Sequence, residues 1–222
     1  YGLHRDENRR ATCRYRVNYQ PQGLSDWGAL GGVIGKLAGS YWEVAAIEGI
    51  DTPPGSDQMK HMGAAMASFG SIPLYHLVGH TPEAPTIDAV CDPTDLDCVE
   101  INEQDIVNFY GNYGGKGEKV DVVVFSAPQL SIIEMNQVAD LLEGQKVHKD
   151  TALLVATSPT VGADAERLGI SQRIEDAGGL VLHGMCFYQS YAREMALANG
   201  WRRLMTNSAK LVNIIGGYGY QP

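Results

Sequence analysis

Length, composition and charge limit the class of protein that this sequence can encode. The chain has 222 residues, of which 44% are hydrophobic and 19% are charged, enough apolar residues for one large core or two small ones and too many for a disordered chain. Its apolar runs are far shorter than the roughly 20 residues of a bilayer-spanning helix, and 17 basic against 26 acidic residues give a formal charge of −9, so neither a membrane nor a nucleic acid is an expected partner.

The cysteines and the first residues indicate where the protein works and how it begins. The four cysteines lie at wide and uneven intervals, and no signal-peptide pattern is present: Cys13, Cys91, Cys98 and Cys186. This usage favours a reducing cytoplasm over a secreted disulfide framework. The chain starts at Tyr1 and runs directly into a dense polar and basic segment, a start typical of the middle of a larger polypeptide.

Residues 1–90 predict a Gly- and Ala-rich α/β region that a partner chain or a missing half completes. Small residues dominate at 28–35 and 63–70, which indicates helices or turns whose backbones approach closely. The run Thr52–Gly55 predicts a turn, and Ser56 or Asp57 is a suitable N-cap for a helix through Ala67.

Residues 91–118 predict a linker that contains one short helix. The segment 91–98 is acidic and turn-prone, and residues 111–117 are rich in Gly and Asn, as is typical of loops. Between them, residues 102–110 have the pattern of a helix.

Residues 119–222 predict an α/β domain with a parallel sheet and covering helices. Apolar runs that predict strands alternate with helical patterns, with strands at 120–125, 152–156, 180–182 and 203–205 and helices at 131–142, 162–168, 171–177 and from about 208. Right-handed crossovers place such helices on the faces of a parallel sheet.

Small polar residues follow each predicted strand of this domain. In open α/β sheets, ligands bind beyond the carboxyl ends of the strands, where helix N-termini offer unpaired N–H groups. The candidate residues at this edge are Ser126, Ser131, Cys186, Thr206, Asn207, Ser208 and Lys210. Ser, Thr and Asn are also ordinary N-cap residues, so each hydroxyl alone is explained by a capping role. Together they predict a site for a small carboxylate or phosphate.

The N-terminal segment and two histidines give further candidates. His4 to Arg10 mixes both signs of charge; it is either a solvated surface with local ion pairs or a place where Arg9 holds a substrate anion. His76 and His80 have the i, i+4 spacing of metal ligands on a helix. Gly79 and the apolar run 72–78 instead favour a strand leading into a turn. Outside a helix, the i, i+4 spacing does not place the two imidazole groups on one metal ion.

Several ordered motifs in this sequence together resemble those of the aconitase X family. They are Tyr1-Gly2-Leu3-His4, Glu7-Asn8-Arg9, His76-Leu77-Val78-Gly79, Thr81-Pro82-Glu83-Ala84, Val120-Asp121, Pro128-Gln129-Leu130-Ser131, Cys186 and Thr206-Asn207-Ser208-Ala209-Lys210. The resemblance spans nearly the whole chain, but it corresponds only to the C-terminal half of the family's larger polypeptide.

The resemblance implies a hydro-lyase that removes water from a small hydroxy acid, such as cis-3-hydroxy-L-proline or mevalonate 5-phosphate. Such enzymes combine a large and a small component with an iron–sulfur cluster, so a complementary chain and a small subunit are implied partners. It also implies that Arg9 and Asn8 bind the carboxylate and that Ser126, Ser131, Thr206 and Asn207 orient it. Glu7, His76, Ser208 and Lys210 are the implied catalytic residues, and Cys186 is an implied cluster ligand.

The sequence departs from the family pattern beside Pro128. Ala127 occupies the position of a family cysteine, and Gln129 replaces a histidine. The chain therefore supplies at most one recognised cluster ligand, and the general base stays open between Glu7, His76 and a group of the missing half. A non-catalytic scaffold subunit of an aconitase X-like complex is the alternative hypothesis.

Overall fold

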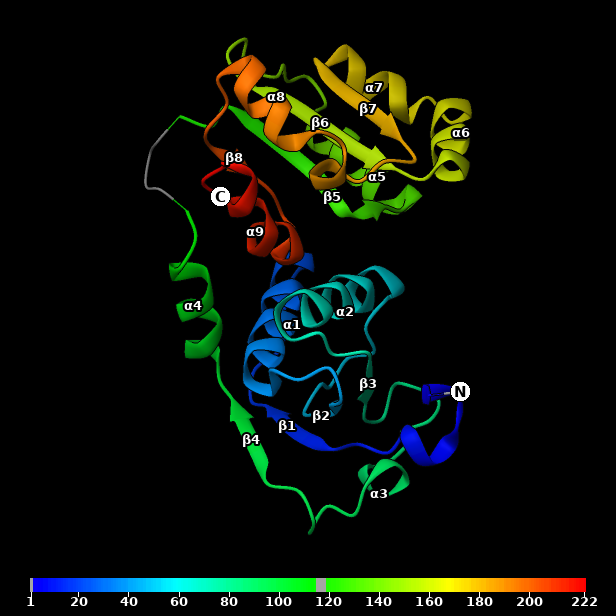
Figure 1. The fold of residues 1–222 in the computed structure, drawn as a ribbon. Helices are drawn as coiled ribbons and strands as arrows, with labels where there is room; N and C mark the ends of the chain where they lie inside the picture. The colour runs from blue at the N-terminus through cyan, green and yellow to red at the C-terminus, as the bar shows by residue number, and fades with distance from the viewer. Residues whose placement is uncertain (1, 115–118) are drawn as a thin grey trace. The chain divides into compact units, whose positions relative to one another are not determined.

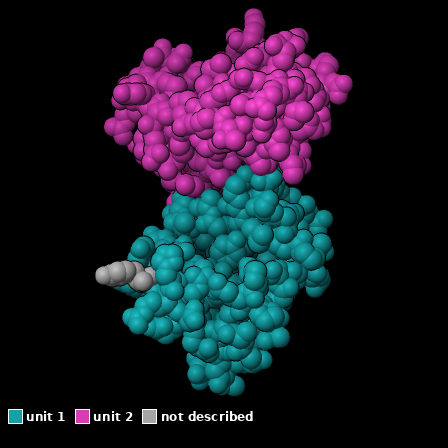
Figure 2. Space-filling view, turned by 90° about the vertical axis from the view of Figure 1, so that its right-hand side faces the viewer, with its two compact units in different colours: residues 1–112 teal, residues 113–222 magenta. Residues whose placement is uncertain are grey.

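A computed structural model describes residues 2–114 and 119–222 and divides the chain into two compact units, residues 1–112 and 113–222 (Figure 2). Each unit contains a four-stranded sheet in which all neighbouring strands are parallel. Helices cover the sheets (Figure 1), so the predicted α/β class is confirmed. Tyr1 and residues 115–118, which belong to the predicted first motif and loop, lie outside the described residues.

The first unit is built around the central strands β1 and β2. Its elements are η1 (Gly2–His4), η2 (Asp6–Asn8), β1 (Cys13–Val17), α1 (Leu24–Ala38), β2 (Val44–Glu48), α2 (Ser56–Gly70), β3 (Leu74–Leu77), α3 (Ile87–Val90), β4 (Cys98–Ile101) and α4 (Glu103–Gly111). The strands lie in the order β3-β2-β1-β4. The N-cap of α2 is Gly55 rather than Ser56 or Asp57, because the helix begins one residue earlier than expected.

Helices α1 and α2 pack against each other through the predicted small residues. A Cβ atom added to Gly31 would lie 2.2 Å from the carbonyl oxygen of Met62, and one added to Gly70 would lie 2.1 Å from that of Gly35. Real Cβ atoms do not approach backbone oxygens this closely, so only glycine permits this helix separation. The predicted close approach of the two small-residue segments is therefore confirmed.

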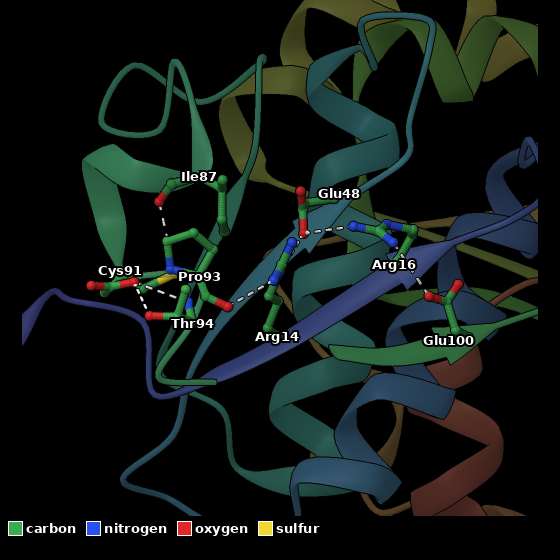
Figure 3. A network of polar contacts seen from close by, with 9 residues as sticks. Arg14, Arg16, Glu48, Ile87, Cys91, Pro93, Thr94 and Glu100 are labelled. Atoms are coloured by element: carbon green, nitrogen blue, oxygen red, sulfur yellow. Dashed lines mark hydrogen bonds and ion pairs between the residues drawn. The ribbon is translucent and has the colours of Figure 1, made fainter. Parts of the chain in front are cut away.

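The opposite face of the first sheet carries a ladder of ion pairs, shown in Figure 3. Arg14 Nε lies 2.5 Å from Glu48 Oε2, and Arg16 Nη1 lies 3.5 Å from Glu100 Oε1. Arg14 Nη1 also donates to the carbonyl of Pro93 at 3.1 Å. This contact fixes the segment after α3 against the sheet, with Ala84, Val90 and other small apolar residues beneath it.

The predicted linker over residues 91–118 is corrected in its first part. Residues 98–101 form β4, which pairs with β1, and the helix expected at 102–110 is α4. Both belong to the first unit. Glu100 and the preceding acidic turn hide this strand in the sequence, because Glu100 faces the ion-pair ladder instead of a core.

The second unit follows the predicted alternation of strands and helices. Its elements are β5 (Val122–Leu130), α5 (Ile132–Leu141), β6 (Ala152–Thr157), α6 (Pro159–Arg167), α7 (Ile170–Asp176), β7 (Gly179–His183), η3 (Phe187–Gln189), α8 (Ala192–Asn199), β8 (Leu204–Met205), α9 (Ala209–Ile215) and η4 (Gly216–Tyr218). The strand order is β7-β6-β5-β8. Separate hydrophobic clusters include the α5, α6 and α7 residues and the α8 and α9 residues.

Two parts of the second unit differ from the sequence-based prediction. Strand β5 continues through residues 126–130, which were expected to follow the strand, with a register shift against β6 between Phe125 and Leu130. Helix α8 was not predicted. Its buried residues are Ala192 and Ala196, whereas Leu197 is 79% exposed, so the apolar residues of this segment do not mark the buried face.

The two units share one strand arrangement. In each, the first strand is central, the second and third lie to one side, and the fourth pairs on the other side of the first. The chain therefore reverses its direction across the sheet between β1 and β4, and again between β5 and β8. Such switch points open crevices at the carboxyl ends of the strands.

Over the described residues, no helix is long and apolar enough to cross a membrane.

We predict that Gly70→Ala lowers the free energy of unfolding by about 1 to 3 kcal/mol, because its methyl group would overlap the backbone of Gly35. Urea denaturation followed by circular dichroism measures the change. Gly111→Ala in α4 is the matched control, since a Cβ there meets no atom within 4 Å, and it should leave stability unchanged or raise it by up to about 1 kcal/mol. Equal stability of Gly70→Ala and the wild type would contradict the close approach.

Candidate functional site

The first candidate site is a charged cavity of about 430 Å³ in the first unit. It is lined by Asp6, Glu7, Arg9, Arg10, His76, Glu83, Ala89 and Val90. Three sequence-predicted residues thus meet in one place: Glu7, Arg9 and His76. Arg9 precedes β1 instead of following a strand, so the carboxyl-end rule does not explain this site.

Arg9 is held by a carboxylate that the sequence analysis did not assign a role. Arg9 Nε donates to Glu83 Oε2 at 2.8 Å, and Arg9 Nη2 donates to Glu83 Oε1 at 2.5 Å. Its third nitrogen, Nη1, donates to the carbonyl of Leu3 at 2.7 Å. Glu83 belongs to the Thr-Pro-Glu-Ala motif. It lies 74 positions from Arg9, so no local sequence pattern indicates that the two side chains pair.

The Arg9–Glu83 pair changes the acid–base properties of both side chains. The hydrogen bonds from Arg9, and secondarily its positive charge, hold the pKa of the Glu83 carboxyl below its ordinary value. The hydrogen bond with Glu83 likewise raises the pKa of Arg9. The Glu83 carboxylate is therefore a weaker base than an ordinary carboxylate, which makes it a poor candidate for a general base.

His76 is buried in β3, with 2% of its surface exposed. Its Nε2 lies 2.6 Å from the carbonyl oxygen of Arg9; since a carbonyl only accepts, Nε2 carries the hydrogen. His80 contacts a different carbonyl, that of Ile50, at 2.8 Å. The two histidines therefore bind backbone groups separately, in agreement with the predicted strand and turn.

Glu7 and Asn8 lie on the exposed side of the same segment. Glu7 pairs with Arg5 at 2.9 Å, and Asn8 Nδ2 donates to the carbonyl of Gly2 at 2.8 Å. A second cavity, of about 520 Å³, is lined by Gly2, Leu3, His4, Glu7, Asn8, Arg10, Thr12, Tyr41, Trp42 and Pro73. Arg10 lines both cavities and was missed because sequence alone does not rank it against Arg9.

The second candidate site is the β5–β8 switch point of the second unit. Ser126 Oγ accepts from the backbone N–H of Phe187 at 3.3 Å, and Ser208 Oγ donates to the carbonyl of Ala127 at 2.5 Å. Gln129 Nε2 donates to the carbonyl of Met185 at 3.1 Å. These three bonds join the end of β5 to α9 and to the segment around Cys186.

Two of the predicted hydroxyl groups, those of Ser131 and Ser208, serve as helix caps in this structure. Ser131 Oγ accepts from the N–H of Glu134 at 3.2 Å, and Ser208 Oγ accepts from the N–H of Leu211 at 3.1 Å. Thr206 Oγ1 accepts from the N–H of Ser208 at 3.1 Å. Ser208 is 2% exposed and donates its single hydroxyl proton to Ala127, so this hydroxyl group is engaged by the backbone and not by a ligand.

The less buried groups of the rim are Asn207, Lys210 and Cys186. Within the described ranges, no hydrogen bond engages the side chain of Asn207, which leaves its amide available to a ligand. Lys210 Nζ lies 6.0 Å from the ring centroid of Tyr188. Burial, and secondarily the neighbouring Cys186, raises the pKa of the Tyr188 hydroxyl. Tyr188 was missed because an isolated tyrosine after a strand carries no distinctive pattern.

The cysteines of this chain do not by themselves fit an iron–sulfur cluster. Such clusters are typically held by several thiolates. The second unit contains Cys186 as its single cysteine, and nowhere in residues 2–114 or 119–222 do three His, Cys, Asp or Glu side chains gather as metal ligands. All four cysteines are free thiols.

The fold and these sites define a two-unit parallel α/β protein with a charged cavity in one unit and a capped polar rim in the other. Family models for the second and third domains of aconitase X match residues 11–111 and 120–222, respectively, and together match nearly the whole chain. The chain belongs to the aconitase X family.

Relatives and a solved structure agree with this assignment. The chain is 35% identical to the phosphomevalonate dehydratase large subunit of Methanothermobacter thermautotrophicus over 98% of its own length and 51% of that protein. It is 29% identical to the cis-3-hydroxy-L-proline dehydratase of Pseudomonas aeruginosa, over 97% and 37%. The crystal structure of Thermococcus kodakaraensis aconitase X in its holo-form superposes with a TM-score of 0.87 at 29% identity, over 100% and 54%. The chain spans about half the length of the large subunits it matches.

The Arg9–Glu83 pair predicts a pH-dependent contribution to stability. Because the folded-state pKa of Glu83 is lowered, this contribution is present above the unfolded value of about 4.3 and is lost as pH falls through the folded value. Carboxyl ¹³C NMR should show Glu83 titrating below its ordinary range, and Arg9→Gln should raise its pKa toward that range. Arg10→Gln, which removes a neighbouring cation, is the control; an ordinary Glu83 titration in the wild type would contradict the pair.

We predict that Ser208→Ala lowers the free energy of unfolding by about 1 to 3 kcal/mol, since it removes an N-cap and leaves the buried Ala127 carbonyl without this donor. Ser158→Ala, which removes the N-cap of α6, should cost only about 1 kcal/mol. Urea titrations compare the two variants. A Ser208→Ala protein as stable as the wild type would show that the hydroxyl is not structural.

Proposed function

We propose that this chain is a component of an aconitase X-type dehydratase that removes water from a small hydroxy acid. Its membership of the family supports this proposal, and the relatives it matches are named as dehydratases. The observation that carries the proposal is the cavity in which Arg9, His76 and Glu7 meet. It offers a cation for a carboxylate beside two groups able to accept a proton.

The substrate class follows from what the relatives' named substrates share. Cis-3-hydroxy-L-proline and mevalonate 5-phosphate both carry a hydroxyl group on the carbon β to a carboxylate. Removal of the α-proton and loss of the β-hydroxyl as water forms a carbon–carbon double bond in either acid. We therefore propose a 3-hydroxy carboxylate, with cis-3-hydroxy-L-proline as the first candidate and mevalonate 5-phosphate as the alternative.

In the first unit, Arg9 would bind the substrate carboxylate, with Asn8 at the edge of the neighbouring cavity. This contact would hold the carboxylate in one position before and after the α-proton leaves. Glu7 or His76 would take the proton, unless a group of the complementary half does so. His76 Nε2 is committed to the carbonyl of Arg9, so its Nδ1 would be the accepting atom.

In the second unit, Asn207 would orient the substrate and Lys210 would supply positive charge or a proton to the leaving hydroxyl. Ser126, Ser131, Thr206 and Ser208 would act by fixing the rim, since their hydroxyl groups make the backbone contacts described above. An iron–sulfur cluster, where the complete enzyme holds one, would receive Cys186 as a ligand and would need its other ligands from elsewhere.

The proposed partners are a complementary aconitase X-type chain and a small subunit. The name "large subunit" of the matched relatives and the half-length match support them. The alternative proposal is a non-catalytic scaffold of such a complex. Ala127 at a family cysteine position favours it, as does Gln129, whose amide serves to hold the backbone at Met185.

We predict that the chain, co-expressed with its complementary chains and purified anaerobically, dehydrates cis-3-hydroxy-L-proline or mevalonate 5-phosphate. Lys210→Met should lower kcat at least about 100-fold, the usual contribution of a proton-transfer group. Lys149→Met, at an exposed position of the same unit, is the control and should leave turnover unchanged. Product formation is followed by NMR.

Two outcomes would overturn the enzymatic proposal in favour of the scaffold. One is the absence of dehydration of both acids by a complex whose subunits are all present. The other is unchanged turnover in both single variants, Lys210→Met and Arg9→Gln, which would place the active groups on another chain. Iron and sulfide analysis of the same sample decides whether a cluster accompanies the activity.

A further inference from the structure

The Thr81–Ala84 turn, which carries the Glu83 carboxylate, is fixed by hydrogen bonds and packing. Gly79 N–H donates to the carbonyl of Ala84 at 2.8 Å, and Thr81 Oγ1 accepts from the N–H of Leu77 at 3.0 Å. Ala84 has no exposed surface and packs against Ala46 and its neighbours. Glu83 therefore extends from a backbone that is fixed immediately on its C-terminal side.

Both ends of Arg9 are anchored to β3 and this turn. The guanidinium group binds both oxygens of Glu83, and the main-chain carbonyl accepts from His76 in β3, five residues before the turn begins. Arg9 itself lies in the short segment between η2 and β1, outside regular structure. Its position thus depends on these contacts more than on secondary structure.

The contacts leave a defined part of the guanidinium group unused. An arginine side chain has five N–H donors. Glu83 takes one from Nε and one from Nη2, and the carbonyl of Leu3 takes one from Nη1. Among the described residues, one N–H on each Nη atom has no further partner, and a carboxylate has two oxygens that can each accept one such hydrogen bond.

We infer that Glu83 is a positioning residue, which orients Arg9 so that its two remaining N–H groups bind the substrate carboxylate. This inference rests on the function proposed above. Glu83 could instead compete with the substrate for Arg9, because it neutralises the guanidinium charge. The geometry favours positioning, since Glu83 occupies the Nε edge and leaves donors on both terminal nitrogens. Arg10, which lines the same cavity, supplies the uncompensated positive charge.

The experiment compares Glu83→Gln, Arg9→Met and the double variant in the complete complex. Glu83→Gln keeps the size of the side chain but loses its charge and one acceptor oxygen. It should raise KM about tenfold and change kcat less than threefold, because Arg9 binds a group present in both ground and transition states. In the Arg9→Met background, Glu83→Gln should have no further effect. Asp88→Asn, an exposed carboxylate on α3, is the control and should change neither constant.

The ¹⁵N signal of Arg9 Nε gives a readout independent of turnover. In the wild type its hydrogen should exchange slowly, and in Glu83→Gln the exchange should be faster. A lower KM in Glu83→Gln would show competition and overturn the inference, as would an unchanged KM or additive effects in the double variant.

The same samples separate this inference from the proposed function. If the wild-type complex dehydrates neither acid, the proposed reaction fails, and binding of the acids followed at the Arg9 signal decides the inference. Tighter binding by the wild type than by Glu83→Gln supports positioning. Equal affinity, or no binding to the wild type, overturns it.

Discussion

The ion pair between Arg9 and Glu83 is the contact on which the first unit's cavity depends. It joins a segment before β1 to a turn after β3, and neither residue lies in a helix or strand. The rest of the first unit holds the two residues of this pair in position. The glycine contacts of α1 and α2 fix one face of the sheet, the sheet fixes β3, and β3 delivers His76 and the turn that carries Glu83. Both partners of the Arg9 side chain and carbonyl, Glu83 and His76, therefore depend on the position of β3.

The second unit could be predicted closely from sequence because helices cover both faces of its sheet. Its strands are then continuous apolar runs such as Val122–Val124, which stand out against their surroundings. The first unit has an ion-pair ladder on one face, so Arg14, Arg16 and Glu48 interrupt the apolar pattern of β1 and β2. The same cause hid β4. Charged residues on a sheet face are stabilised by partners on other strands, and no local pattern reveals those partners.

Candidate residues were predicted by type, but their roles depend on partners distant in the sequence. A serine after a strand is equally suited to cap a helix and to bind a ligand, and the Ser208 contacts with Ala127 and Leu211 decide for a structural role. Conversely, the role of Glu83 is indicated by its contact with Arg9 and not by its own sequence motif. The residue motifs thus point to the segments that line the two candidate sites, whereas the contacts of each side chain within them depend on residues distant in the sequence.

The shared strand order of the two units does not produce two equivalent sites. At the β5–β8 switch point, Ser126 and Ser208 are 1% and 2% exposed, so backbone contacts fill the crevice and only its outer groups, such as Asn207 and Lys210, can meet a ligand. In the first unit the charged groups instead gather before β1, away from the carboxyl-end crevice. Among the described residues, the charged groups of the first unit therefore line a cavity, whereas the polar groups of the second unit lie on an open rim. The same strand order thus supports two different arrangements of polar groups, because the side chains around each switch point, and not the strand order, decide what faces solvent.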